Sequence, residues 1–154
     1  MDPLNKILNW INELPLEIQS ELVSLTSHFH FDKTIERELD ENERLSKFKE
    51  YLDSENLDDN EIVQRALFIK KLIDFSMAGR GTEEDWTEVL DRHLDTRSRL
   101  KEKGLPTKMN DDFLSTYQER KSKWIELYSN WENISNNELS DKKIADWYFM
   151  QIVK

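Results

Sequence analysis

The chain has 154 residues and no cysteine, which excludes disulfides, thiolate zinc sites and cysteine nucleophiles. Its formal net charge is -10 and 35% of its residues are charged, yet 10% are aromatic, which is enough bulk for one folded core. Only 3 Gly and 3 Pro are present, too few for the turns of a β-sandwich or barrel.

The first part of the chain predicts three helical stretches. Asp2 is the predicted N-cap of the first helix and Pro3 is its first helical residue. Pro15 separates this helix from the next one. Apolar residues at helical spacing then predict a second helix over residues 16–31. The helical spacing of apolar residues is interrupted midway through residues 35–52, so this stretch is either a bent helix or two short ones.

A fourth helix is specified at both ends. Asp58 can cap it, Glu61 three residues later completes a capping box, and Gly79 is well placed to end it in a left-handed conformation. The segment between is the most apolar of the chain, on more than one face. We therefore expect a central helix in which Leu67 and Ile73 are fully buried.

Three further helices follow. Thr82 caps the fifth and Gly104 ends it, while Asn110 or Asp111 opens the sixth and Ser140 caps the last.

The sequence thus predicts an all-α fold, an irregular bundle of six to seven helices. No internal repeat is evident. We expect a single domain over residues 1–154, with a possible boundary near residues 56–60, where the charge character changes.

The negative charge is concentrated at one end of the sequence. Residues 1–61 hold 16 acids and 6 bases, whereas residues 62–154 hold 16 of each. An acidic surface repels phosphate backbones and anionic lipid, which disfavours duplex DNA and membranes and favours a basic protein as partner. The predicted partner-binding residues are acids of the densest stretch: Glu36, Asp40, Glu43, Glu50 and Asp53. The alternative is that these acids only keep a small protein in solution.

His28, His30 and Asp32 form a cluster of possible metal ligands. In an extended segment these alternate residues share one face, as a metal site requires, but on a helix they do not. Because the segment continues a helical pattern, we expect no metal and no cofactor, and these three residues stay a weak metal candidate.

Aromatic residues of the sixth helix offer a second candidate site. Its members are Tyr117, Arg120, Trp124, Tyr128 and Trp131. Such a face can stack single-stranded bases or line a small-molecule pocket. The alternative is that the aromatic side chains form an ordinary core face.

Two other positions carry weaker signals. His93 lies on an apolar helical stripe, where a histidine is usually a core or edge residue with one hydrogen bond. Arg80 lies between two glycines, which a helix stop and a tight turn explain, and it is a possible interaction residue.

These features favour a non-enzymatic, acidic interaction domain that binds a basic protein and inhibits or organises it. Immunity proteins, antitoxins and nucleic-acid mimics share this profile of composition. The alternative is a helical module that binds a small molecule or single-stranded nucleic acid around Trp124. A metal-dependent enzyme at residues 28–32 comes third.

The cellular setting is suggested by composition alone. The chain has no apolar run of about 18 residues and no signal-peptide pattern, which with the absence of cysteine predicts a cytoplasmic protein. Few Ala and Gly residues and many Lys, Asn and Ile residues suit an AT-rich bacterial or phage genome.

Overall fold

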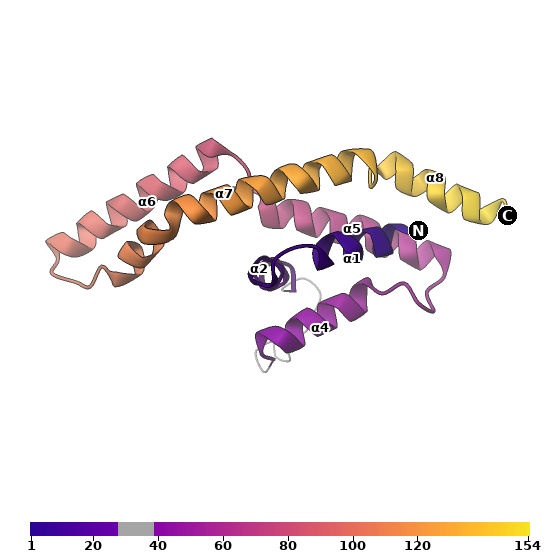
Figure 1. The fold of residues 1–154 in the computed structure, drawn as a ribbon, viewed down its shortest axis with the longest axis horizontal. Coiled ribbons are helices and arrows are strands. Elements are labelled where there is room, and N and C mark those ends of the chain that lie inside the picture. Colours follow the sequence, from indigo (N-terminus) through magenta and orange to yellow (C-terminus); the bar gives the residue numbers. More distant parts are fainter. Residues whose placement is uncertain (28–38) are drawn as a thin grey trace. The chain divides into compact units, whose positions relative to one another are not determined.

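A computed structural model describes residues 1–27 and 39–154, and this part of the chain contains α-helices and no strand (Figure 1). The prediction of an all-α fold is therefore confirmed. Seven helices lie in the described residues: α1 (Pro3–Asn12), α2 (Leu16–Ser27), α4 (Glu41–Leu52), α5 (Asp59–Met77), α6 (Glu83–Glu102), α7 (Lys108–Asn137) and α8 (Asp141–Ile152). None of these seven has both the length and the apolar character that a bilayer crossing requires.

The chain divides into two compact units. The first unit consists of Met1–Ser76 together with Ile134–Lys154, and the second unit is Met77–Asn133. The limits between the units thus fall near the end of α5 and within α7. The expectation of a single domain, with a possible boundary near residues 56–60, stays a prediction.

Helices α1, α6 and α8 begin where the capping signals place them. The Asp2 carboxylate accepts a hydrogen bond from the backbone N–H of Asn5, 2.8 Å away. Thr82 and Asp85 form a reciprocal capping box, with N···O distances of 3.2 and 3.1 Å. Ser140 caps α8 as predicted. Each of these side chains satisfies a backbone N–H that the helix itself leaves without a partner.

The first unit has a core built from widely separated segments. Helix α4 packs against α1 and α2. Near-completely buried apolar side chains come from these helices and from α5, α8 and the turn before it: Leu4, Ile7, Ile11, Leu22, Phe48, Leu52, Ile69, Ile73, Leu139 and Ile144. A salt bridge of 3.1 Å between Lys70 and Asp141 also joins α5 to α8.

The prediction for the interior of α5 is half right. Ile73 is fully buried, but Leu67 is only partly covered, and Ile69 is fully buried instead. Phe68 and Phe75 are exposed on the same helix. Because α5 is apolar on several faces, the sequence pattern does not reveal which stripe packs inward.

In the second unit, α6 and α7 form an antiparallel hairpin and lie side by side (Figure 1). The Tyr117 hydroxyl donates to the backbone oxygen of Trp86 at 2.9 Å, which joins the two helices near the start of α6. Near its end, Arg97 Nε donates to Asp111 Oδ1 at 2.6 Å. Helix α7 begins at Lys108, earlier than the predicted start at Asn110 or Asp111.

Candidate functional site

The predicted partner-binding acids gather around α4. Asp40, Glu43, Glu50 and Asp53 are all exposed, and we call these four residues the acidic surface. Glu36, the fifth predicted acid, lies outside the described residues.

Helix α4 presents the acidic surface on the side away from its core. Its buried face consists of Leu45, Phe48 and Leu52. Successive helical residues rotate by about 100°, which places Glu43 and Glu50 roughly opposite Phe48. The two carboxylates are seven residues apart and therefore lie nearly two turns along the same stripe.

The ends of α4 are fixed by local contacts. The Asp40 carboxylate accepts the backbone N–H of Glu43 at 2.8 Å, so this acid both caps the helix and belongs to the acidic surface. The guanidinium of Arg44 donates twice to the backbone oxygen of Leu39, at 3.2 and 3.1 Å. The acids beside it are therefore carried by a helix whose start is well defined.

The whole segment around α4 is negatively charged at its surface. Nine acids lie between residues 40 and 61, and every one of them is exposed: Asp40, Glu41, Glu43, Glu50, Asp53, Glu55, Asp58, Asp59 and Glu61. Three bases occur in the same segment, of which Arg44 and Lys49 are partly covered. The segment thus presents a negatively charged surface.

The possible metal ligands His28, His30 and Asp32 lie outside the described residues. In residues 1–27 and 39–154, no group of three or more His, Asp or Glu side chains is placed to hold a metal ion.

The aromatic residues of α7 are mostly packed inside. Tyr117, Trp124 and Trp131 are buried, with Trp124 only 3% exposed, while Tyr128 is partly covered. Arg120 is the exposed member of the set. Buried rings have little surface left on which a nucleotide base could stack, so these contacts favour a packing role.

The loop between α5 and α6 packs closely against α7. The guanidinium carbon of Arg80 lies 4.6 Å from the centroid of the Trp124 ring, a cation–π arrangement. The backbone oxygen of Arg80 accepts the indole N–H of Trp86 at 2.7 Å.

Gly79 has the predicted left-handed conformation, with φ +81°. A Cβ at Gly81 would lie 2.5 Å from Cγ of Tyr128, a close approach that the sequence analysis missed.

We expect Gly81→Ala to lower the free energy of unfolding by about 1–3 kcal/mol, because the new methyl group overlaps the Tyr128 ring. In a denaturant titration, Gly81→Ala combined with Tyr128→Ala should lose less than the sum of the single losses. Gly79→Ala is the control: nothing lies within 4 Å of its Cβ, so its cost is conformational and should add to that of Tyr128→Ala. If the losses of Gly81→Ala and Tyr128→Ala are strictly additive in the double variant, the overlap of the new methyl group with the Tyr128 ring has no energetic effect.

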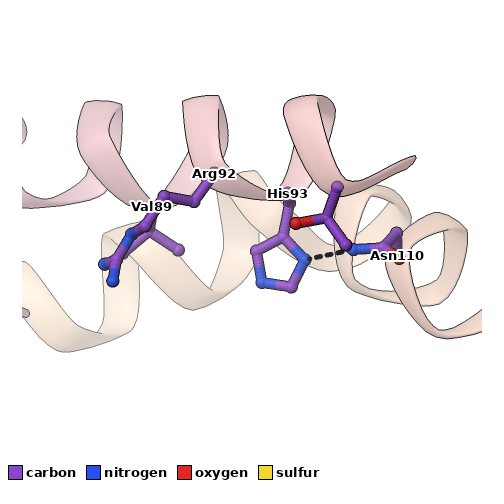
Figure 2. Close-up of a pocket in the computed structure, with 5 residues that line it drawn as sticks. Val89, Arg92, His93 and Asn110 are labelled. Atoms are coloured by element: carbon purple, nitrogen blue, oxygen red, sulfur yellow. Dashed lines mark hydrogen bonds between the residues drawn. The ribbon is translucent and has the colours of Figure 1, made fainter. Parts of the chain in front are cut away.

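His93 and Phe113 form a stacked pair across the hairpin. Their ring centroids are 3.8 Å apart with an interplanar angle of 8°. His93 Nδ1 lies 3.0 Å from Nδ2 of Asn110 (Figure 2). An amide NH2 group can only donate, so Nδ1 accepts and the ring proton is on Nε2. The sequence interpretation of His93 is a core or edge residue with one hydrogen bond, and the structure shows it partly covered and in contact with Asn110.

Two pockets adjoin His93. The smaller has a volume of about 350 Å³ and is lined by Val89, Arg92, His93, Thr96 and Asn110 (Figure 2). The larger has a volume of about 720 Å³ and extends toward the loop between α6 and α7. Its apolar lining residues are Leu100, Pro106, Met109 and Phe113.

Ion pairs hold both ends of the hairpin. Hydrogen bonds from Arg97 and Thr107 lower the pKa of the Asp111 carboxyl, because both donors stabilise its charged form. At the other end, the hydrogen bond with Glu83 raises the pKa of Lys121 above its ordinary value. These contacts join α6 to α7 at both ends of the hairpin.

The function has to be inferred from these residues and contacts, because the chain matches no protein-family model, no curated protein and no solved structure.

Proposed function

We propose that this protein is a non-enzymatic interaction domain whose acidic surface binds a basic protein and thereby inhibits or organises it. The observation that carries the proposal is the placement of Glu43 and Glu50 on the outer stripe of α4, within a segment whose acids are all exposed. A basic partner would find several carboxylates on one helix face.

A helical acidic surface suits fast and selective association. Charges of one sign on an exposed face attract an oppositely charged partner over distances comparable with the Debye length, about 8 Å at physiological salt. The buried side chains of α4 fix the positions of these charges relative to one another. A partner with correctly spaced bases gains more from such a fixed array than from a mobile acidic tail.

The alternative function, binding of a small molecule or single-stranded nucleic acid around Trp124, has less support. Trp124 and Tyr117 are buried, and Arg80 covers one face of the Trp124 ring. Stacking of a base or ligand on Trp124 would require these contacts to open.

Charge reversal tests the proposed function. With the basic protein that co-purifies from the native host, Glu43→Lys combined with Glu50→Lys should slow association several-fold at low salt, because the attraction is lost. The difference should shrink at about 1 M salt, where the Debye length is about 3 Å. Stopped-flow or surface-binding kinetics measure both effects. Folding should hardly change, since exposed charges contribute little to stability.

Glu119→Lys combined with Glu126→Lys is the matched control. These exposed acids of α7 have the same seven-residue spacing and the same change in charge, but they lie in the segment where acids and bases balance. The control should affect the association rate much less. If both pairs of substitutions slow association equally, or if the association rates do not depend on salt, the acidic surface only keeps the protein in solution.

A further inference from the structure

The larger pocket of the α6–α7 hairpin has an apolar floor that consists of Leu100, Pro106, Met109 and Phe113. Phe113 lines it, and the stacked ring of His93 supports Phe113 from one side. Met109 lines the same pocket although it is 86% exposed, and its flexible thioether can adapt to a bound molecule. At about 720 Å³ the pocket is in the range of small-molecule sites, which is roughly 300–1,000 Å³.

The charged groups of this pocket are predominantly positive. Lys108 and Arg120 line it together with a single acid, Asp112. The guanidinium carbon of Arg120 lies 5.6 Å from the centroid of Phe113, and its Nε donates to Thr116 Oγ1 at 2.8 Å. This bond uses one of the five guanidinium N–H donors. A cationic donor is therefore held over the Phe113 ring, on which the His93 ring also stacks.

His93 lines the same pocket as Arg120. Since Asn110 occupies Nδ1 of His93, the ring proton is on Nε2, which Figure 2 shows on the side of the ring away from Asn110. His93 lines both pockets.

We infer that this pocket binds a small aromatic carboxylate. Leu100, Pro106 and Met109 of the apolar floor cover the ring, and Arg120 with Lys108 receives the carboxylate, a charge-assisted contact that a neutral or cationic molecule cannot make. Asp112 opposes a negative ligand, so a monoanion fits the net lining charge better than a dianion. This site is independent of the acidic surface, with which it shares no residue.

Titration calorimetry of the full chain with 2-naphthoate tests this inference. We expect saturable binding of one molecule per chain, and binding of the neutral 2-naphthamide about tenfold weaker because it lacks the charged oxygens. The absence of saturable 2-naphthoate binding, or equal affinity for the amide, would overturn the inference.

Charge variants assign the binding to this pocket. Arg120→Gln should weaken 2-naphthoate binding about tenfold, while Asp112→Asn should strengthen it a few-fold by removing a repulsive charge. Arg99→Gln is the matched control: it removes the same charge from an exposed position of the hairpin that does not line the pocket. Because all three positions are exposed, the variants should fold, which circular dichroism checks.

Three results of these binding measurements would overturn the proposed site or ligand. Equal losses in Arg120→Gln and Arg99→Gln would mean unspecific attraction and would overturn the site. Weaker binding in Asp112→Asn would mean that the pocket prefers a ligand with a positive group, which overturns the assignment of an anion. Met109→Ala should weaken binding several-fold if the ring lies on the apolar floor, and unchanged binding would place the ligand elsewhere.

Discussion

Replacement of Phe48 by alanine should lower the free energy of unfolding by about 3–5 kcal/mol. Phe48 is fully buried in the middle of α4, and this helix packs against both α1 and α2. Loss of the ring leaves a cavity among several helices, which the surrounding core can fill only in part. Urea unfolding followed by far-ultraviolet circular dichroism measures the change.

Lys47→Ala is the control for this prediction. Lys47 is the exposed neighbour of Phe48 on α4, so its truncation should change stability by less than about 0.5 kcal/mol. Similar small losses in both variants would show that Phe48 is not a core residue of α4. The acidic surface would then lack the fixed support on which the proposed function depends.

The ends of the helices could be predicted because capping is local. An N-cap and the N–H that it binds lie within three or four residues of each other, as in the pairs Asp2–Asn5 and Thr82–Asp85. The same holds for the left-handed stop at Gly79. Such signals are complete in a short stretch of sequence, so they need no knowledge of the tertiary fold.

For a helix that is apolar on several sides, the side that packs inward could not be predicted. Leu67 and Ile69 of α5 are both aliphatic residues within its apolar pattern, and only the packing of the first unit makes Ile69 the buried one. In α4 the pattern was informative, because polar residues, Glu43, Ser46 and Glu50, occupy the positions opposite Phe48. The exposure of Glu43 and Glu50 was therefore predictable, whereas the identity of the partner was not.

Contacts between distant residues were invisible in the sequence. Gly81 was explained by a tight turn, but the ring of Tyr128, 47 positions later, is what leaves no room for a side chain there. The pocket beside His93 depends likewise on Phe113 from the other helix of the hairpin. Such sites arise from the register of α7 on α6, which no local motif encodes.

Trp86→Ala should lower the free energy of unfolding by about 3–5 kcal/mol in the second unit. Trp86 is buried, its ring stacks on Phe113 with centroids 6.5 Å apart, and its indole N–H donates to the backbone oxygen of Arg80. Trp86→Phe keeps most of the apolar contact but leaves that oxygen without its donor, so it should lose less, about 1–3 kcal/mol. Equal losses in the two variants would mean that the hydrogen bond, and not the ring, dominates.

The same variants test whether the chain is one domain, as its sequence predicts. In a single cooperative domain, Phe48→Ala in the first unit and Trp86→Ala in the second should shift one common unfolding transition. Hydrogen exchange should then show lowered protection in both units for either variant. If each variant affects only the amides of its own unit, the two units unfold independently and the prediction of a single domain is wrong. In that case the proposed binding of a basic protein to the acidic surface of α4 should persist in Trp86→Ala, because the first unit would remain folded.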